Sequence, residues 1–542
     1  MDAVFQPAAD ALGAPVEQLK LIFCLLVSYP LGSVFIRVPG KTLKHVFNLI
    51  VAGTYLIPLL NLYGGTLELL ADVLVTYFLA RAMKNRKNMP WIVFWVNMAH
   101  LTHNHVMRVV LEREDAPFDI TACQMVLVMK LTTFAWNVYD GARPEEELDS
   151  WQNKMAVREY PSILEFLGYA FYFPGILVGP YLEYRAYISL VDGSLFRIPV
   201  EPVTSASSPA ISRVSSSTSI SGTRRAIPDG RKRVAYGKGL LGLVFLITYV
   251  VMAGSYSAPV MLQPWFLQKP LWYRIGFMQA CQVIARTKYY GVWTLTEGAA
   301  ILTGFGFTGY TPSGKSTWHG AANLDVLNVE FAPNFKVLLD SWNMKTNTWL
   351  RECIYKRVTP KGKKPGFKSS MLTFGTSAFW HGIAPGYYMS FLYGGFVQTV
   401  GRLARGFIRP LVLPVPNAAE SSKKAVSPPP TALKRAYDLI GILVTALILN
   451  FASVPFILLN LHDCLEAWRR VNWYGLWIIG GAFAFFYGGG RAWLKRVQTL
   501  RIKKAAGVVP PSQEKKGDEY PQMQVPPVDA GIKEVEKKLP VL

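Results

Sequence analysis

The sequence predicts an all-α, polytopic membrane protein with about eleven transmembrane or re-entrant helices. Of its 542 residues, 51% are hydrophobic and only 17% are charged, whereas about 25% are charged in a typical soluble domain. The apolar residues also gather in long blocks that contain no acidic or basic side chain. The clearest blocks are residues 21–36, 239–268, 439–461 and 471–490. Since a helix needs about 20 apolar residues to cross the hydrocarbon core, most of these blocks are long enough to span a membrane.

The same length rule places the membrane-embedded segments along the chain. In order, they lie near residues 20–38, 45–63, 66–82, 91–110, 122–138, 163–182, 239–263, 270–285, 289–310, 369–401, 437–461 and 472–490. Several are short or polar, so we expect some to be re-entrant or interfacial, and residues 369–401 to make one or two passes. Residues 1–18 lack the basic region of a cleavable signal peptide, which predicts that the first span acts as an uncleaved signal.

The charge is strongly basic and unevenly spread. The formal net charge is +22, and Lys and Arg gather at residues 81–87, 224–238, 356–368, 402–409 and 491–504. Short basic loops of this kind are typical of the cytoplasmic side of a membrane. No nucleic-acid fold signature accompanies them, so we expect no nucleic-acid partner. Anionic lipid headgroups and an anionic cytosolic substrate explain the charge better.

The composition divides the chain into a membrane domain, residues 1–500, and a polar C-terminal tail, residues 501–542. Within the membrane domain, a Ser- and Arg-rich insertion at residues 194–235 predicts a disordered cytoplasmic loop, as we also expect for the tail. No internal repeat is evident, which counts against the inverted-repeat folds of many transporters. The five cysteines show neither disulfide nor metal-ligand spacing, so we expect no disulfide framework.

A single histidine marks the first candidate site. Residues 369–401 contain no Asp, Glu, Lys or Arg, and their one histidine is His381. An ionisable side chain inside a membrane is costly to bury and indicates function, although such a histidine can also bond a neighbouring helix and serve structure. A neutral imidazole is suited to act as a general base.

The second candidate segment, residues 341–357, precedes this histidine. We expect it to be a helix with Trp342 and Trp349 on one face and amide and hydroxyl side chains on an adjacent face. Tryptophan beside Lys and Arg is typical of the bilayer interface, so an interfacial amphipathic helix is one interpretation. That interpretation leaves Asn343 unexplained, whose amide can donate to a carbonyl oxygen as it becomes an oxyanion.

Together with the basic loop at residues 356–368, His381 and Asn343 predict an acyl transfer buried in the membrane and supplied by an anionic, phosphate-bearing donor. The sequence contains no Gly-x-Ser-x-Gly nucleophile elbow, so we expect direct transfer without an acyl-serine intermediate.

Four blocks of sequence resemble motifs of the membrane-bound O-acyltransferase (MBOAT) family. The block similar to the histidine motif of that family contains Trp380-His381-Gly382, Gly386-Tyr387 and Phe391. The block that resembles its asparagine motif, in the lysophospholipid acyltransferase branch, contains Trp342-Asn343, Thr346, Trp349-Leu350 and Tyr355. Residues 130–141 and 166–181 resemble two further motifs of that branch. The likeness runs from about residue 20 to residue 500, and the chain is similar to the fungal broad-range lysophospholipid acyltransferases.

This resemblance implies a helical fold around a catalytic tunnel, in the endoplasmic reticulum membrane, with no metal and no cofactor. Acyl-CoA would enter as co-substrate from the cytosol, and a lysophospholipid would enter from the lipid side. His381 would deprotonate the free hydroxyl, expected at sn-2, and Asn343 would hold the acceptor or the carbonyl oxygen. The residues expected to contact substrate or line the tunnel are Trp342, Thr346, Trp349, Arg351, Tyr355, Trp380, Tyr387 and Asp140.

Several charged and polar residues have two interpretations. Arg351, Lys356, Arg357 and Lys361 are candidates to bind the phosphates of CoA, or are ordinary charges of a cytoplasmic loop. Asp140 pairs with a neighbouring helix or with a substrate headgroup.

Three histidines and two glycines are better explained by packing. His100, His103 and His105 lack the carboxylate or cysteine that would complete a metal site, so we interpret them as helix-packing or interfacial residues. Gly382 and Gly386 form a small-xxx-small pair that is typical of close helix packing.

Two alternatives remain open from the sequence. The first keeps the chemistry but transfers to a sterol, a diacylglycerol or a protein, which is disfavoured because residues 130–141 and 342–355 resemble the lysophospholipid branch. The second is a non-catalytic transporter or receptor. It predicts paired intramembrane charges or repeats, and these are scarce here.

Overall fold

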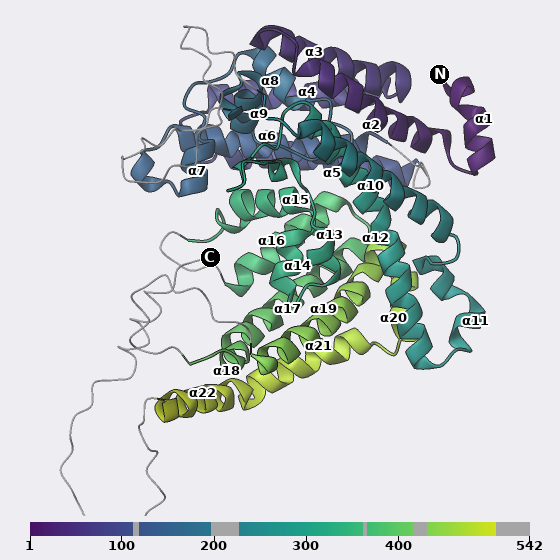
Figure 1. Ribbon diagram of the computed structural model, residues 1–542, viewed down its shortest axis with the longest axis vertical. Helices are drawn as coiled ribbons and strands as arrows, with labels where there is room; N and C mark the ends of the chain where they lie inside the picture. The colour runs from purple at the N-terminus through teal and green to yellow at the C-terminus, as the bar shows by residue number, and fades with distance from the viewer. Residues whose placement is uncertain (112–118, 197–226, 361–365, 416–430, 506–542) are drawn as a thin grey trace, which may run out of the picture.

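The computed structural model describes residues 1–111, 119–196, 227–360, 366–415 and 431–505, and these are almost entirely helical (Figure 1). The predicted all-α class is therefore confirmed for this part of the chain. Two short strands, β1 (Gly309–Tyr310) and β2 (Ser316–Thr317), pair antiparallel in a small hairpin. Most of the predicted loop at residues 194–235 and most of the tail at residues 501–542 lie outside the described residues.

The first half of the chain forms the upper part of the molecule in Figure 1. Its elements are α1 (Asp2–Leu12), α2 (Val16–Phe35), α3 (Lys41–Thr54), the π-helical turn η1 (Tyr55–Leu59), α4 (Tyr63–Ala82), α5 (Met89–Val110), α6 (Ile120–Gly141), η2 (Glu145–Glu147), α7 (Ser150–Met155), α8 (Ile163–Ala170), α9 (Tyr184–Val191) and η3 (Ser194–Phe196). Helix α6 is buried along nearly its whole length, so it forms the centre of this half.

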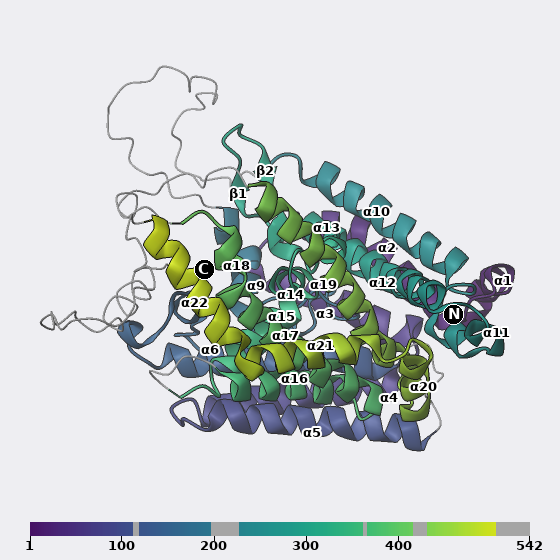
Figure 2. The same ribbon diagram turned by 90° about the horizontal axis from the view of Figure 1, so that it is seen from below.

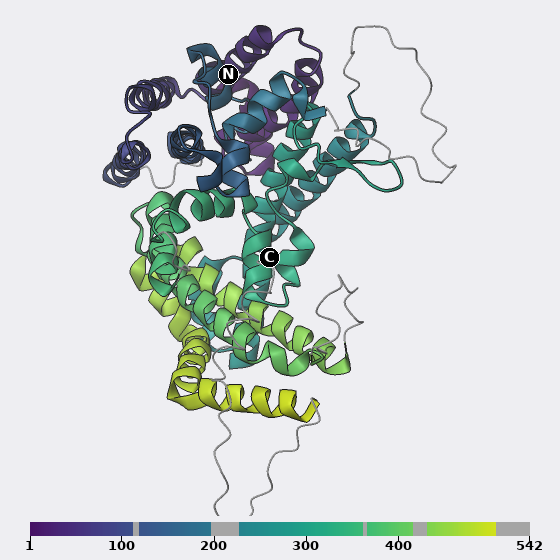
Figure 3. The same cartoon turned by 90° about the vertical axis from the view of Figure 1, so that its left-hand side faces the viewer.

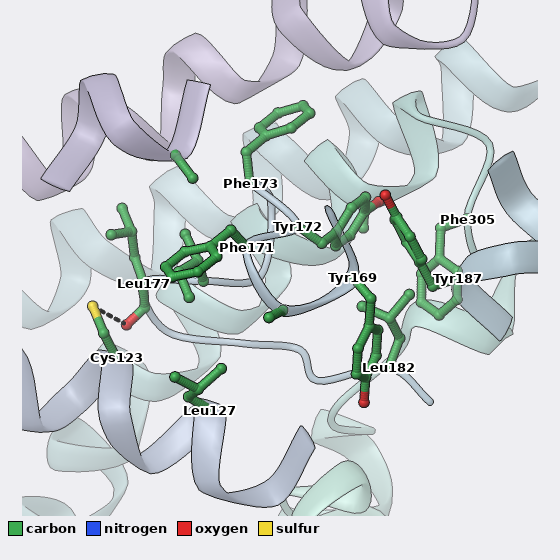
Figure 4. Close-up of a cluster of buried hydrophobic side chains, with 14 of the residues drawn as sticks. Cys123, Leu127, Tyr169, Phe171, Tyr172, Phe173, Leu177, Leu182, Tyr187 and Phe305 are labelled. Carbon is green, nitrogen blue, oxygen red and sulfur yellow. Dashed lines mark hydrogen bonds between the residues drawn. The ribbon is translucent and has the colours of Figure 1, made fainter. Parts of the chain in front are cut away.

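Residues 163–182, predicted as a membrane-embedded segment, do not form a membrane-spanning helix. Helix α8 ends at Ala170, and residues 171–183 continue without regular helix through a core of aromatic side chains (Figure 4). Tyr172 is buried there and shares a hydrogen bond of 2.6 Å with Thr303, while Lys130 of α6 donates to the carbonyl oxygens of Tyr169 and Ala170 at 2.6 and 2.8 Å. The segment is apolar because protein surrounds it, and hydropathy does not distinguish a protein interior from lipid.

Most of the second half of the chain lies below the first in Figures 1 and 3. Its helices and helical turns are α10 (Arg231–Met252), η4 (Ala258–Leu262), α11 (Pro264–Leu267), α12 (Leu271–Leu302), η5 (His319–Ala321), α13 (Val326–Glu330), α14 (Phe335–Ser341), α15 (Met344–Trp349), the π-helical turn η6 (Leu350–Tyr355), α16 (Phe367–His381), α17 (Pro385–Phe407), α18 (Arg409–Val412), α19 (Ala432–Leu458), α20 (Leu461–Arg470), α21 (Tyr474–Phe485), η8 (Phe486–Gly490) and α22 (Arg491–Ala505).

One long helix joins the two halves. The sequence predicts separate segments at residues 270–285 and 289–310, but α12 is continuous over 32 residues. The charges that interrupt the apolar pattern are accommodated inside the protein: Arg286 pairs with Glu330 at 2.7 Å, and the Lys288 ammonium lies 5.3 Å from the centre of the Tyr289 ring. Helix α12 packs against α2 of the first half and against α10 and α19 of the second half.

Five helical stretches within the described residues are long and apolar enough to cross a bilayer. They are Val16–Phe35, Lys41–Leu59, Tyr63–Ala82, Arg231–Met252 and Ala432–Leu458. Helices α5, α6, α12 and α17 are of comparable length, with 22, 22, 32 and 23 residues, but they carry more polar side chains. The protein is thus a polytopic membrane protein in which much of the apolar surface of some helices faces other helices.

Residues 369–401 form two helices, α16 and α17, which pack against each other, and α5 runs beside them in Figure 2. Helix α16 ends at His381, and Gly382 adopts a φ of 137°, a region that favours glycine. The N–H of Gly386 in α17 donates to the carbonyl of Leu459 at 2.9 Å. A side chain at position 386 would lie 2.1 Å from the carbonyl oxygen of Pro455, so the predicted close packing is confirmed at Gly386. The break after α16 places His381 at a helix end.

Candidate active site

The structure brings His381 and Asn343 to the wall of one cavity of about 420 Å³. Helices α12, α14, α15, α16, α17 and α19 and the turn η6 enclose it. His381 and Asn343 are 38 positions apart in the chain, yet both line the cavity, as their predicted joint role in acyl transfer requires. Of the other predicted site residues, those that line the cavity are Trp342, Thr346, Arg351 and Tyr355.

The imidazole of His381 stands in an aromatic cage. Its ring lies 5.0 Å from the ring of Phe391 in a stacked arrangement and 4.9 Å from the ring of Phe456, edge to face. Tyr387 and Trp380 complete the cage at 5.5 and 4.7 Å. Among the described residues, none forms a hydrogen bond with the imidazole, so its nitrogen atoms remain able to exchange a proton with a bound substrate.

Asn343 is held by a second asparagine, Asn323. Asn343 has a φ of 44°, a left-handed conformation that asparagine tolerates better than most residues. Its Oδ1 accepts a hydrogen bond of 3.2 Å from Asn323 Nδ2, and Asn323 Oδ1 accepts from the backbone N–H of Lys345 at 3.0 Å. No described residue accepts from Nδ2 of Asn343, which is therefore able to donate into the cavity. The sequence analysis missed Asn323, because it lies 20 residues before Asn343 and nothing in the chain indicates that the two side chains are in contact.

The prediction that residues 341–357 form one helix is wrong, because the left-handed turn at Asn343 delays the helix until Met344. Trp342 therefore does not share a face with Trp349. It packs on Tyr289 and Trp293 of α12 at 5.8 and 5.2 Å. Trp349 is fully buried in the opposite direction, which excludes an interfacial helix as the explanation of this tryptophan.

Trp349 and Trp380 lie behind the cavity wall and do not line it. Their rings are 5.6 Å apart. The indole N–H of Trp349 donates to Thr132 Oγ1 at 2.9 Å, and that of Trp380 donates to the carbonyl of Met125 at 3.0 Å. Both acceptors belong to α6, so these tryptophans attach the cavity wall to the first half of the protein. Their expected role in substrate contact is corrected to one in positioning α15 and α16.

Asp140 is fully buried and paired with a neighbouring element. Its two carboxylate oxygens accept hydrogen bonds of 2.9 and 2.5 Å from the guanidinium of Arg357, which also stacks on Trp136 at 4.3 Å. Asp140 does not line the cavity. Of its two interpretations, the structure supports the contact between elements and not the headgroup site.

The structure also separates the four cations that were candidates for phosphate binding. Arg357 is neutralised by Asp140, and Lys356 pairs with Glu352 at 2.6 Å and with Asp149 at 2.7 Å. Lys361 lies outside the described residues. Arg351 lines the cavity and is half-exposed, although it also contacts Glu352 at 3.0 Å.

Three cations that the sequence did not single out line the cavity, namely Lys336, Arg402 and Arg405. Arg402 donates to the hydroxyl of Ser370 at 3.1 Å, and Arg405 donates to Asn334 Oδ1 at 3.2 Å. In the described part of the chain, neither arginine has a carboxylate within 4.0 Å. They were missed because residues 402–409 are indistinguishable by sequence from other cytoplasmic basic clusters.

The cavity therefore has an aromatic end at His381 and a cationic end at Arg402 and Arg405. Helix α17 provides residues to both. At a rise of about 1.5 Å per residue, the α-carbons of Arg402 and Arg405 lie roughly 16 and 21 Å from that of Phe391. An elongated anionic ligand can thus reach from the cationic end to the histidine.

The three histidines of α5 have separate partners. His100 Nδ1 lies 2.6 Å from an oxygen of Asp72, and the exposed His103 ring stacks on that of His100 at 6.4 Å. His105 lies 3.3 Å from the carbonyl oxygen of Trp380. Across the described residues, no group of three or more His, Cys, Asp or Glu side chains is arranged to hold a metal ion.

The fold and the cavity lined by His381 and Asn343 describe a helical membrane protein with an internal polar site. Comparison with known proteins identifies its family. The model of the MBOAT, membrane-bound O-acyltransferase family, matches residues 109–422. The chain is 38% identical over 472 residues to the lysophospholipid acyltransferase of Schizosaccharomyces pombe, covering 87% of this chain and 86% of that protein. It is 36% identical over 497 residues to the lysophospholipid acyltransferase of Saccharomyces cerevisiae, with coverages of 90% and 77%. The mouse membrane-bound glycerophospholipid O-acyltransferase 1 is 29% identical over 486 residues.

The chain belongs to the MBOAT family.

Proposed function

We propose that this protein is a lysophospholipid acyltransferase, which moves an acyl chain from acyl-CoA to the free hydroxyl of a lysophospholipid in phospholipid synthesis and remodelling. The observation that carries the proposal is that His381, Asn343, Arg402 and Arg405 all line one cavity. The two arginines lie roughly 16 and 21 Å along α17 from Phe391, which stacks on His381. Family membership and the names of its relatives favour the phospholipid acceptor over the sterol, diacylglycerol and protein acceptors.

The proposed chemistry uses the imidazole nitrogens of His381 and Nδ2 of Asn343, none of which has a hydrogen-bond partner among the described residues. His381 removes the proton from the acceptor hydroxyl, expected at sn-2, as its oxygen attacks the thioester carbonyl carbon. Asn343 Nδ2 donates to the carbonyl oxygen, which becomes an oxyanion in the tetrahedral intermediate. The intermediate collapses, the carbon–sulfur bond breaks, and the imidazolium returns its proton to the departing CoA sulfur. The ester is complete and His381 is neutral again.

The cationic end supports acyl-CoA as the donor. Arginine binds phosphate through several charge-assisted hydrogen bonds. Arg402 and Arg405 remain available to an anion because a hydroxyl and an amide hold them in place of carboxylates. The long arm of CoA between its phosphates and its thioester suits a cavity in which charge and imidazole lie at opposite ends. The same end would face the cytosol, where the basic loops are expected, and we propose residence in the endoplasmic reticulum membrane.

The test is CoA release by the purified protein in detergent–lipid micelles, with oleoyl-CoA and a panel of lysophospholipids, beside the His381→Ala variant. Release that requires a lysophospholipid and vanishes in the variant is the expected result. Release with a sterol, a diacylglycerol or a peptide instead would move the protein to another acceptor class. Binding of lysophospholipid without any release of CoA would contradict an enzymatic function.

A further inference from the structure

We propose that His105 is a positioning residue that fixes the backbone on both sides of His381, an inference that rests on the proposed function. His105 belongs to α5, far from the cavity residues in sequence, and its side chain is buried at 8% exposure. It does not line the cavity, so its effect would pass through the peptide units that carry His381.

The first contact is a hydrogen bond to the residue before His381. His105 Nε2 lies 3.3 Å from the carbonyl oxygen of Trp380. Since a carbonyl oxygen only accepts, Nε2 must carry the hydrogen. Trp380 lies in the last turn of α16, where carbonyl groups have no partner within the helix. His105 thus satisfies a helix end that would otherwise be free to shift or fray.

The second contact is with the residue after His381. A side-chain carbon placed on Gly382 would lie 3.5 Å from Cγ and Nδ1 of His105, and 3.4 Å from the Tyr387 ring. The imidazole of His105 therefore lies against the backbone of Gly382, whose φ of 137° already favours glycine. The peptide before His381 and the residue after it are held by the same ring.

The helix that carries His105 is itself firmly held. On its other face, His100 bonds Asp72 of α4 at 2.6 Å, and Asn104 Nδ2 donates to Gln124 of α6 at 2.9 Å. Trp380 also donates its indole N–H to the carbonyl of Met125 in α6. Helix α5 therefore bonds the backbone carbonyl of Trp380, and α6 bonds its ring. The first half of the protein thereby sets where the end of α16 lies.

The contacts of His105 should affect where His381 lies and not how the substrates bind. The cage of Phe391, Phe456 and Tyr387 orients the His381 ring through α17 and α19, but its Cα position depends on the end of α16. A displacement of about 1 Å at a reacting group costs up to about a hundredfold in rate. Loss of the His105 contact should therefore lower kcat and leave the binding of both substrates nearly unchanged.

The experiment compares His105→Leu, His105→Gln and His103→Leu in the full-length protein. His105→Leu removes the donor, whereas glutamine can present an amide N–H at a similar reach. His103→Leu is the matched control, because it makes the same change two residues away on an exposed position of the same helix. Steady-state CoA release gives kcat and KM for each substrate, and thermal unfolding in detergent reports folding.

We expect His105→Leu to lower kcat roughly tenfold to a hundredfold with both KM values within about twofold of wild type. His105→Gln should recover most of kcat, and His103→Leu should match wild type. Equal kcat for His105→Leu and His103→Leu would overturn the inference while leaving the proposed function intact, as would a His105→Gln variant as slow as His105→Leu. A wild-type protein inactive with every acceptor would overturn the proposed function and this inference with it.

Discussion

The two ends of the cavity hold their functional groups in different ways. At the aromatic end, His381 is held among aromatic rings, and elsewhere in the cavity wall Asn343 is held by the amide of Asn323. The imidazole nitrogens of His381 and Nδ2 of Asn343 have no partner in the described part of the chain. At the cationic end, Arg402 and Arg405 donate to neutral oxygens and are therefore available to bind an anionic ligand. The first end is built for chemistry and the second for binding, so substitutions at the two ends should separate kcat from KM.

The largest effect is expected at His381. His381→Ala removes the general base, so turnover should fall to background, a loss of about a hundredfold to ten-thousandfold or more, with near-normal abundance and thermal unfolding. CoA release and the unfolding temperature in detergent measure the two quantities. A variant that fails to accumulate would indicate a structural histidine instead.

Asp140 does not line the cavity, so its replacement should change the stability of the protein and not its kinetics. Asp140→Asn breaks a buried pair with Arg357 and leaves the guanidinium without its counter-ion, which costs about 3–5 kcal/mol. The unfolding temperature should drop markedly, while the protein that remains folded should show nearly wild-type KM values. An increased KM for lysophospholipid at unchanged stability would restore Asp140 as a headgroup site.

Asn343 comes next. Asn343→Ala should lower kcat on the order of a hundredfold if its amide stabilises the oxyanion. Asn343→Asp keeps the shape and the tolerance of a left-handed conformation but has no N–H, so it should lose as much. An aspartate variant with wild-type kcat would remove Asn343 from oxyanion stabilisation.

The smallest effect belongs to the cationic end. Replacing Arg402 or Arg405 with methionine should raise KM for acyl-CoA about tenfold, the loss of roughly one charged hydrogen bond, with little change in kcat. Arg409→Met is the control, since Arg409 is exposed nearby and does not line the cavity. Equal KM values for all three variants would show that the donor binds elsewhere.

The sequence located the chemistry better than the surroundings. His381 and Asn343 stand in blocks with enough fixed neighbours to be singled out, and the long apolar blocks predicted the helical membrane class. The sequence could not show that residues 163–182 lack a spanning helix, because an aromatic protein core has the same hydropathy as a lipid-facing segment. The two segments within α12 failed because their charges are paired by partners distant in sequence, such as Glu330.

Two of the four phosphate candidates, Lys356 and Arg357, failed for a related physical reason. Glu352 lies four residues before Lys356, but only the fold shows that Asp149 also pairs with Lys356 and that Asp140 neutralises Arg357. Arg402 and Arg405 look like ordinary loop charges, and only the fold shows that hydroxyl and amide groups hold them at the cavity. Which charges remain available is decided by tertiary contacts, which residue spacing does not specify.

The most direct test of the central claim measures both products of a single incubation. Wild-type protein with labelled acyl-CoA and a lysophospholipid should form free CoA and labelled diacyl phospholipid in equal amounts, without label on the protein, and His381→Ala should form neither. Label retained on the protein as an acyl intermediate, or equal product formation by His381→Ala, would contradict direct transfer at this cavity.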